Sequence, residues 1–400
     1  MKDPVKEWIE KEKMGVYGDI PICMVSDYCQ TWTRNIASEL GLVRFVFNCI
    51  GSFPSLCEAI LQESYGGIGE EEATDNRKMV IKGIPDNVTV TKAEVPGFFP
   101  KGTSLYDEFL GAYETSDGII LNSFTELEPE YIKLFETFKG KKVWPLGPVG
   151  LINRDITEQI HRGTTISSTV MNDRLLNFLN SKPDDSVIYL CMGSLARLSL
   201  AQVIEIGLGL EESGHPFVWA IKTHGKSDEV ESWLKESRFE KRNQSNGFII
   251  KEYWVPQVMI LSHLSVGGFL THCGWNSSME GITAGVPMLT WPCFFDQFLN
   301  AKFLVNVLKI GVMVRVKEPT LWWDEISGIE RGEIEKSVKE LMGCSEEAVM
   351  RRKRANELKI LAEKAMGVDG STQNNLDAFV HEAFSLVKIN ISKKLNKSKF

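Results

Sequence analysis

The stretch from Trp254 to Gln297 reads WVPQVMILSHLSVGGFLTHCGWNSSMEGITAGVPMLTWPCFFDQ. It contains two short apolar runs, GFLTH and VPMLTW, and each is followed by polar residues that can begin a helix. Short apolar runs bounded by turn residues are typical of strands buried in a parallel sheet. The stretch therefore predicts two successive strand–turn–helix units at the centre of an α/β domain.

Similar apolar runs alternate with amphipathic segments on both sides of this stretch. ICMVSD at 22–27, VRFVFN at 43–48 and SVIYLCMGS at 186–194 predict strands, and segments between such runs have helical spacing. Ser199 and Gln202 form a capping-box pattern, which predicts that a helix begins there. Regular alternation of strands and helices is the signature of doubly wound parallel sheets. An α/β fold is therefore expected.

The length of the chain and one polar interruption indicate two domains. The 400 residues exceed the usual size of a single domain. Residues 150–170 are polar and lack periodicity, which predicts a connection between domains. We therefore expect two facing Rossmann-like, doubly wound domains, with a ligand at the carboxyl ends of their strands.

The composition restricts the partners and the setting of the protein. The formal net charge of −8 argues against nucleic acid as a partner, since phosphate binding needs a basic surface. No apolar run reaches the length of about 18 residues that a membrane span needs, so no transmembrane segment is expected. The eight cysteines form no CxxC pair and no cluster with zinc-ligand spacing, so no metal site is expected. Scattered thiols in apolar runs indicate a reducing, cytoplasmic setting.

The turn after GFLTH carries the residues best suited to bind a nucleotide. A helix that begins after a parallel strand presents its first N–H groups to an anion. His272, Asn276 and Ser277 would add donors without net charge, and Asn276-Ser277-Ser278 supply strong N-cap residue types. Glu280 lies one turn further along the same helix face, where a carboxylate suits a ribose diol. The alternative is an ordinary capped helix with a solvated glutamate.

Other polar and aromatic residues also follow predicted strands. Trp254 comes after GFIIKEY, so its ring either stacks on a base or packs in the core. Asp296 and Gln297 follow VPMLTW, where they either face sugar hydroxyls or simply begin a helix. Ser194 lies in the turn after the 186–194 run and could donate to a phosphate, although many such turns bind nothing.

Taken together, these residues resemble the plant secondary-product glycosyltransferases, the UDP-sugar-dependent family with the GT-B fold. The resemblance to the family's signature box spans 254–297 without a gap and includes WVPQ, HCGWNS, the EG pair and the closing DQ. A match of this length is far more specific than a single glycine-rich motif. VIYLCMGSLARLS, GIILNSFTELEPEY and KVWPLGPV resemble further segments of the family, so essentially the whole chain is covered.

The resemblance implies a set of donor-binding residues. They are Ser194, Trp254, Val255, Gln257, His272, Trp275, Asn276, Ser277, Glu280, Asp296 and Gln297. In the family pattern Trp254 would stack on the uracil, and Glu280 would take the ribose hydroxyls. His272, Asn276 and Ser277 would hold the diphosphate.

The resemblance also implies the sugar and the mechanism. Trp275, Asp296 and Gln297 would orient the sugar, and a closing Gln is usual with UDP-glucose, so a hexose, most simply glucose, is expected. UDP-glucose is then a donor substrate, and no cofactor or metal is expected. The implied reaction is inverting: a His deprotonates an acceptor hydroxyl, an Asp steadies that His, and the oxygen attacks the anomeric carbon. Asp27 matches the position of that Asp.

The sequence departs from the family at the catalytic base. The base His lies early in the family, yet none of the six histidines here precedes His161. We therefore expect an N-terminally truncated chain in which Asp27 lacks its partner and sugar transfer is not measurable. One alternative is a truncated, catalytically inactive relative that only binds UDP-sugar. A nicotinamide-dependent oxidoreductase on a similar fold is disfavoured, since no GxGxxG follows a predicted strand.

The expected domain division follows the same resemblance. It comprises an incomplete acceptor-side domain at 1–150, a linker at 151–170, a UDP-sugar-binding domain at 171–380, and a helix end with a Lys-rich tail at 381–400. The expected partners are a UDP-sugar and a small-molecule acceptor whose identity the sequence does not reveal. We expect the chain to act as a monomer.

Overall fold

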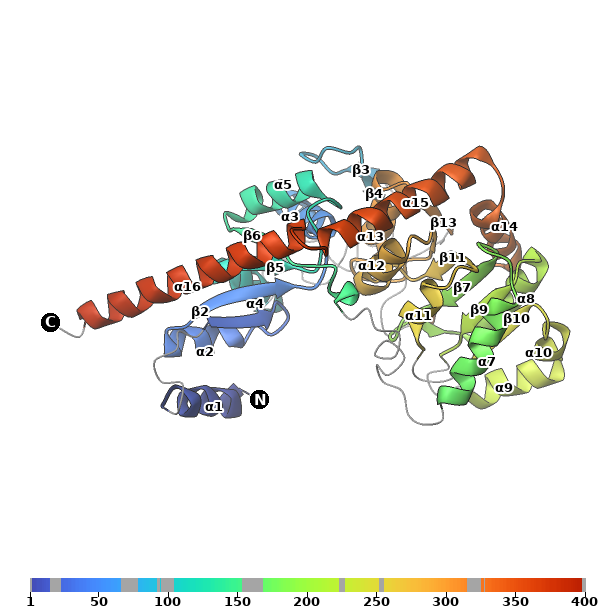
Figure 1. The fold of residues 1–400 in the computed structure, drawn as a ribbon, viewed down its shortest axis with the longest axis horizontal. Helices are drawn as coiled ribbons and strands as arrows, with labels where there is room; N and C mark the ends of the chain where they lie inside the picture. Colours follow the sequence, from blue (N-terminus) through green and yellow to red (C-terminus); the bar gives the residue numbers. More distant parts are fainter. Residues whose placement is uncertain are drawn as a thin grey trace. The chain divides into compact units, whose positions relative to one another are not determined.

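Two parallel sheets organise the chain, as the alternation of strands and helices predicted (Figure 1). The computed structural model describes residues 2–14, 23–65, 78–91, 94, 104–152, 168–222, 227–251, 255–314, 325–326 and 328–397. The chain divides into a first unit of residues 1–67, 99–149 and 364–400 and a second unit of residues 68–98 and 150–363. The predicted α/β fold class is therefore confirmed.

The first unit contains a four-stranded parallel sheet in the order β1-β2-β5-β6. Gly118 at the start of β5 allows close packing, because a Cβ there would lie 2.4 Å from the ring of Trp144. The strands are β1 (Cys23–Asp27), β2 (Val43–Asn48), β5 (Gly118–Leu121) and β6 (Val143–Pro145). The helices are α1 (Lys2–Met14), α2 (Thr33–Leu40), α3 (Ser52–Tyr65), α4 (Ser104–Glu114), α5 (Pro129–Lys139) and α16 (Ser371–Lys397).

The last helix, α16, packs along this first sheet and completes its core (Figure 1). The ring of Phe379 meets Phe45 and Trp144 edge to face, at centroid distances of 4.8 and 5.4 Å. Such aromatic contacts bury much apolar surface. Residues 364–400 therefore group with the first unit, which differs from the expected assignment of 171–380 to one C-terminal domain.

The second unit contains a six-stranded parallel sheet in the order β10-β9-β7-β11-β12-β13. When these six strands are numbered by their order in the chain, the order across the sheet is 3-2-1-4-5-6, the Rossmann order. It reverses direction between β7 and β11. The strands are β7 (Val187–Cys191), β9 (Phe217–Ala220), β10 (Gly247–Ile250), β11 (Val266–Thr271), β12 (Met288–Thr290) and β13 (Gly311–Met313). A short parallel pair adds β8 (Arg197–Leu198) and β14 (Glu325–Ile326).

Helices of the second unit follow its strands in turn. The main helices are α7 (Ser168–Asn180), α8 (Leu200–Ser213), α9 (Ser227–Glu236), α10 (Phe239–Arg242), α11 (Gln257–Leu261), α12 (Trp275–Ala284), α13 (Gln297–Lys302), α14 (Arg331–Met342) and α15 (Glu346–Ala365). A π-helical turn at Phe303–Val307 extends α13. The strand–helix alternation predicted around 254–297 is thus present on both sides of that stretch.

A small antiparallel pair, β3 (Lys78–Val80) and β4 (Thr89–Thr91), also belongs to the second unit. A two-stranded hairpin is only marginally stable by itself. Just after it, Glu94 forms an ion pair with Lys302 of α13 at 3.0 Å, with side-chain exposures of 18% and 14%. A pair this shielded from solvent is less screened than one on the surface, so it helps to hold the segment.

Helix α8 begins where the capping pattern predicted. The hydroxyl of Ser199 accepts a hydrogen bond from the backbone N–H of Gln202 at 3.1 Å. The side chain of Gln202 does not reach back to Ser199 but bonds the backbone N–H and C=O of Ile329, at 2.9 and 2.8 Å. The predicted cap is therefore confirmed, and its second half is used to hold the segment before α14.

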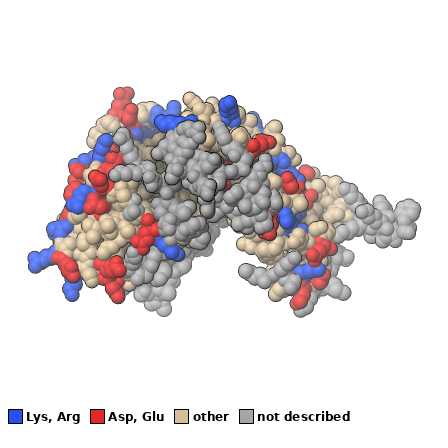
Figure 2. All heavy atoms as spheres, turned by 180° about the vertical axis from the view of Figure 1, so that it is seen from behind, with Lys and Arg blue, Asp and Glu red and all other residues tan. Residues whose placement is uncertain are grey.

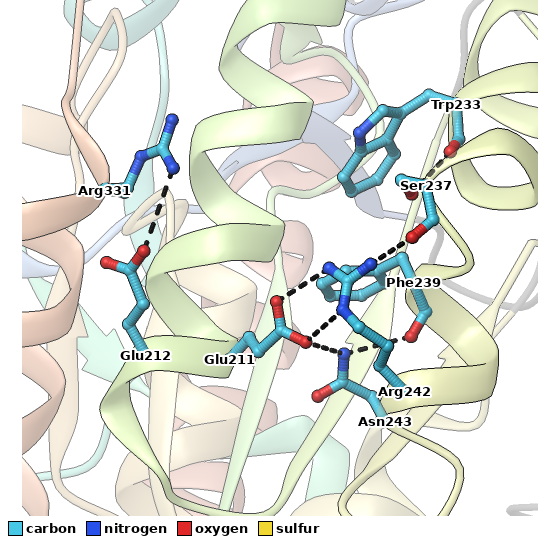
Figure 3. Close-up of polar contacts among 8 residues, drawn as sticks. All are labelled: Glu211, Glu212, Trp233, Ser237, Phe239, Arg242, Asn243 and Arg331. Carbon is cyan, nitrogen blue, oxygen red and sulfur yellow. Dashed lines mark hydrogen bonds and ion pairs between the residues drawn. The ribbon is translucent and has the colours of Figure 1, made fainter.

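The far end of α8 is fastened to the neighbouring helices by one carboxylate (Figure 3). Glu211 accepts hydrogen bonds from Nε and Nη2 of Arg242, both at 2.9 Å, and from Nδ2 of Asn243 at 2.9 Å. Arg242 also donates to the carbonyl of Ser237. Bonding to Arg242 lowers the pKa of Glu211, so the carboxylate stays ionised and the network persists at neutral pH.

Acidic and basic side chains are interspersed over the molecular face in Figure 2. The described residues on that face form no single basic stripe of the kind that binds nucleic-acid phosphates. None of the described helices has both the length and the apolar character needed to cross a membrane. All eight cysteines lie among the described residues, and none forms a disulfide.

Candidate functional site

The carboxyl ends of β7 and β11 lie side by side, at the point where the strand order of the second sheet reverses. Cys191 at the end of β7 pairs with Thr271 at the end of β11. Open α/β sheets bind ligands just outside the strand ends at such a reversal. The turns that follow these two strands, 192–199 and 272–274, therefore form the candidate site.

The ring of His272 lies between two glycines, one from each turn. A Cβ at Gly193 would lie 2.5 Å from the imidazole, and a Cβ at Gly274 would lie 2.5 Å from its Nε2. Gly193 also has a φ of +73°, which a residue with a side chain adopts only with strain. Both glycines are thus needed for the ring to sit between the turns.

Burial and the nearby Lys222 lower the pKa of His272 to about 4. The imidazole is therefore neutral at physiological pH. Its Nδ1 is buried and has no hydrogen-bond partner among the described residues. A buried polar atom without a partner costs free energy, so the ring is well suited to hydrogen-bond a ligand.

Helix α12 starts differently from the expected capped helix. Its N-cap residue is Gly274, and no side chain caps the first turn. Asn276 is exposed and Ser277 is half-buried within that turn, so the prediction that Asn276-Ser277-Ser278 cap the helix was wrong. Cys273 adopts a φ of +65°, which turns the chain sharply out of β11 and points the helix start at the strand ends. The N-cap position itself therefore contributes no side-chain hydrogen bond to the first turn of α12.

A partly buried hydrogen-bond network lies beside this helix start. Nε2 of Gln257, the first residue of α11, donates to Oε2 of Glu280 at 2.6 Å and to Oγ of Ser277 at 3.1 Å. Oε1 of the same amide accepts from the hydroxyl of Tyr189 in β7 at 3.1 Å. Four side chains from three elements thus fix the position of one carboxylate next to the turn.

A second carboxylate lies at the start of α13. Burial raises the pKa of Asp296 to about 6, although a hydrogen bond from Asn300 at 2.6 Å acts against that rise. The same amide nitrogen of Asn300 donates to the carbonyl of Cys273 at 2.8 Å. Asn300 thereby connects the start of α13 to the turn after β11.

Gln297 stands next to Asp296 and is almost fully buried. Its Oε1 accepts hydrogen bonds from the backbone N–H groups of Cys293 and Phe294, at 2.9 and 3.1 Å. Phe295, which lies between Phe294 and Asp296, has a φ of +59°, so the loop is folded tightly around this amide. The oxygen of Gln297 is thus used by its own loop, and its amide nitrogen is the group that can donate elsewhere.

The remaining predicted residues lie apart from this network or outside the described residues. Ser194 is exposed in the turn after β7, and Val255 is half-buried just before α11. Trp254 lies outside the described residues. Asp27 is the last residue of β1 in the first unit, where its Oδ1 accepts a hydrogen bond from the backbone N–H of Cys29 at 2.8 Å. Within the described part of the chain, no group of three His, Cys, Asp or Glu side chains is arranged to hold a metal ion.

Three residues of the site were missed by the reading of the sequence. Tyr189 lies inside an apolar strand run, Gly193 in its turn, and Asn300 in the helix after the closing DQ pair. Each acts through a partner that is distant in the chain, such as the 68 residues between Tyr189 and Gln257. Only the glycine gave a signal, because glycine after a strand often marks a close approach.

Comparison with known sequences gives the same picture over nearly the whole chain. The family described as UDP-glucoronosyl and UDP-glucosyl transferase matches residues 157–326. UDP-glycosyltransferase 73C6 of Arabidopsis thaliana is 41% identical over 396 residues, which is 98% of this chain and 78% of that protein. UDP-glycosyltransferase 73C25 of Barbarea vulgaris is 40% identical over 92% of this chain and 75% of its own length.

Solved structures agree with the sequence comparison. UGT73P12 of Glycyrrhiza uralensis, complexed with glycyrrhetinic acid 3-O-monoglucuronide, superposes with a TM-score of 0.88 at 30% identity, covering 99% of this chain and 79% of that one. UGT71G1 of Medicago truncatula, complexed with UDP-glucose, superposes with a TM-score of 0.76 at 26% identity, covering 96% of this chain and 80% of that one. With identities near 40% over most of both sequences and with the GT-B fold, the chain belongs to the plant UDP-glycosyltransferase family, whose members transfer a sugar from a UDP-sugar to small acceptors.

Proposed function

We propose that this protein binds UDP-glucose at the ends of β7 and β11 and transfers the glucose, with inversion, to a hydroxyl of a small plant-type aglycone. The observation that carries the proposal is the placement of His272 and the Gln257–Glu280 pair at the strand-order reversal of the second sheet. The UDP-glucose complex of the Medicago truncatula relative supports this choice of donor. The cytoplasm is the proposed setting, supported by eight cysteines without disulfides, and a monomer is the proposed active form.

The diphosphate would bind at the start of α12. The N-cap residue of this helix is Gly274, which has no side chain to cover the helix start, and the helix dipole favours an anion there. His272 is neutral and half-buried, so it would donate a hydrogen bond from its ring without needing a counter-charge. Asn276 and Ser277 lie in the same first turn, and Ser194 lies exposed in the adjacent turn. Together they would surround the phosphate oxygens with donors.

The nucleoside would bind beside the Gln257–Glu280 pair. The Glu280 carboxylate, held by the amide of Gln257, would accept both ribose hydroxyls. Trp254 would stack on the uracil, and Val255 next to it would offer its backbone. A carboxylate suits a diol and repels a phosphate, so its place one turn into α12 orders the ligand from phosphate to ribose.

The sugar would bind against Trp275, Asp296 and Gln297. Because Oε1 of Gln297 is held by two backbone N–H groups, the amide nitrogen would donate to a sugar hydroxyl. Asp296 would accept from neighbouring hydroxyls when it is ionised, and its pKa of about 6 leaves it ionised at neutral pH. Trp275 is buried against Phe303, with ring centroids 6.2 Å apart, and would limit the depth of the sugar pocket.

The proposed transfer is a single displacement. A base removes the proton of the acceptor hydroxyl while its oxygen forms a bond to the anomeric carbon. The bond from that carbon to the diphosphate breaks on the opposite face, and UDP leaves with the electron pair. Asp27 would hold the base imidazole in the correct tautomer, as carboxylates do for catalytic histidines.

A binding-only role is the second candidate, and one observation favours it. No histidine precedes His161, so residues 1–160 supply no imidazole to act with Asp27. A general base contributes about 10²–10⁴-fold in rate. Incubation of the 400-residue chain with UDP-glucose and flavonoid, phenolic and terpenoid acceptors separates the two roles. Formation of any glucoside establishes transfer, whereas UDP binding without product establishes the binding-only role.

Glu280→Ala tests the donor site directly. Loss of the carboxylate leaves the ribose hydroxyls without their acceptor, and hydrogen bonds to charged groups contribute about 1.5–3 kcal/mol each. We therefore expect the Kd for UDP to rise by about 10- to 100-fold, measured by isothermal titration calorimetry.

Glu236→Ala, an exposed glutamate at the end of α9, is the matched control and should leave the affinity unchanged. An unchanged Kd in Glu280→Ala would contradict the assignment of the ribose site. Thermal unfolding of both variants verifies that the second unit remains folded.

A further inference from the structure

We propose that Tyr189 is a positioning residue of the donor site: its hydroxyl fixes the amide of Gln257 and, through that amide, the Glu280 carboxylate that receives the ribose diol. This inference rests on the proposed function and deepens it. Tyr189 lies in the interior of the sheet and does not itself reach the candidate ligand. Its effect would pass through one side chain.

The ring of Tyr189 is rigidly held. Its exposure is 0%, and it stacks on Phe269 of the neighbouring strand, with centroids 5.1 Å apart and planes inclined by 15°. A buried tyrosine hydroxyl normally finds a hydrogen-bond partner. Here the partner is Oε1 of Gln257, at 3.1 Å. The sheet therefore presents a hydroxyl at a fixed position directly under α11.

The hydroxyl of Tyr189 can act as a donor over the whole physiological pH range. Burial raises its pKa well above the usual value for tyrosine, with smaller contributions from Cys191 and Glu280. A protonated hydroxyl donates, and of the two ends of an amide only the oxygen accepts. Tyr189 therefore favours the orientation in which Oε1 of Gln257 faces the sheet.

That orientation sends the amide nitrogen to the helix start. Nε2 of Gln257 then donates to Glu280 at 2.6 Å and to Ser277 at 3.1 Å. In the opposite orientation the amide oxygen would face the carboxylate, and two acceptors would repel each other. Tyr189 at the amide oxygen and Glu280 at the amide nitrogen thus favour the same orientation of Gln257. Removal of either side chain leaves this amide, and the remaining partner, less firmly held.

The consequence for binding is specific to the diol. A carboxylate that is already held in place binds a ribose hydroxyl more tightly than a mobile one, because a mobile carboxylate loses conformational entropy on binding. The proposed contact of His272 with the diphosphate does not involve this amide. Loss of the Tyr189 hydroxyl should therefore weaken recognition of the ribose hydroxyls and little else.

Tyr189→Phe is the decisive variant, since it removes one hydroxyl and keeps the stacked ring. The measurement is the Kd for UDP and for 2′-deoxy-UDP, by calorimetry at pH 7.5. We expect Tyr189→Phe to weaken UDP binding by about 3- to 10-fold, the range of one buried hydrogen bond. Binding of 2′-deoxy-UDP, which keeps only one of the two hydroxyls that Glu280 would accept, should weaken less than binding of UDP, so the preference for ribose shrinks.

Three further variants separate positioning from packing. Phe269→Leu disturbs the stack but keeps the hydroxyl, so it should lower the unfolding temperature and preserve the ribose preference. Tyr131→Phe, a buried tyrosine of α5, should leave both affinities unchanged. Gln257→Ala should also lose the preference for UDP over 2′-deoxy-UDP. The double variant with Tyr189→Phe should lose no more of this preference than Gln257→Ala alone, because Tyr189 acts only through Gln257.

The possible outcomes distinguish this inference from the proposed function. If the unaltered protein binds UDP and prefers it to 2′-deoxy-UDP, and Tyr189→Phe keeps that preference, the positioning role is overturned while the donor site stands. An equal loss for both ligands also overturns it, since packing alone would explain that result. If the unaltered protein does not bind UDP, both the proposed function and this inference fail.

Discussion

At the scale of single residues, burial moves two titratable groups of the site in opposite directions. The pKa of His272 falls to about 4 and the pKa of Asp296 rises to about 6, because desolvation disfavours the charged form of each. The imidazole is thus neutral throughout the physiological range, whereas the carboxylate changes charge near its lower edge. Strongly shifted groups that lie together at strand ends are typical of functional sites.

Asp296 predicts a pH dependence for sugar recognition. In the proposed site the ionised carboxylate would accept from sugar hydroxyls more strongly than the neutral acid, so the contribution is present above the pKa of about 6 and is lost as the pH falls through that value. Between pH 7.5 and pH 5 the ionised fraction falls about 10-fold. We expect the ratio of UDP-glucose affinity to UDP affinity to fall over this range, measured by calorimetry.

Asp296→Asn is the control for this pH dependence. Asparagine keeps the size of the side chain and does not titrate, whereas the terminal phosphate of UDP titrates equally in both proteins. The affinity ratio should therefore fall less in Asp296→Asn than in the unaltered protein, and an equal change in both proteins would assign the effect to another group.

At the scale of elements, the site depends on how two helices are joined to one strand. α12 begins directly after β11, and its sharp turn at Cys273 is tied to α13 by Asn300. Asn300 is fully buried and also holds the Asp296 carboxylate. The phosphate end and the sugar end of the proposed site therefore share one anchoring side chain.

Asn300→Ala should disconnect these elements. The change removes one donor from the carbonyl of Cys273 and one from the carboxylate of Asp296, and each such loss costs about 1–3 kcal/mol. We expect the free energy of unfolding to fall by about 2–4 kcal/mol in urea titrations. Asn306→Ala, at an exposed position of the following π-helical turn, should change it by less than about 0.5 kcal/mol. Equal stabilities of the two variants would show that Asn300 is not an anchor.

At the scale of the whole molecule, the C-terminal helix α16 belongs to the sheet nearest the start of the chain. Phe379, Ala383 and Val387 repeat at four-residue spacing and enter the core formed by β2, β5 and β6. The first unit therefore needs the last residues of the chain for its stability.

Phe379→Ala tests this dependence. Removal of a buried aromatic ring costs about 3–5 kcal/mol. We expect the first unit to unfold at a lower temperature, whereas the stabilisation that UDP gives to the second unit persists, measured by calorimetric scans with and without UDP. Phe384→Ala is the matched control, because Phe384 lies on the same helix with 49% of its surface exposed. A similar shift for both variants would refute a core role for Phe379.

The element pattern and much of the site could be predicted because their signals are local. The period of apolar residues predicted β7 and β11, and the capping residue Ser199 predicted the start of α8. The N-cap of α12 was not predicted correctly, since the left-handed turn at Cys273 moves the helix start to Gly274. Turn conformations of this kind arise from packing around the strand end, which residue types alone do not reveal.

The sequence by itself determined the α/β class, the two-sheet organisation and the residues that line the turn after β11, since each follows from periodicity or from residue chemistry within one short stretch. Only the tertiary structure decided which of these residues act together. The amide of Gln257 meets Glu280 across 23 residues and Tyr189 across 68 residues. Likewise, α16 packs on a sheet whose strands lie more than 200 residues before it in the sequence. The hydrogen bond from the Ser371 hydroxyl to the Glu126 carboxylate joins residues that are 245 positions apart. Hydrogen bonds and apolar contacts between distant residues depend on the folded path of the chain, so no local pattern records them.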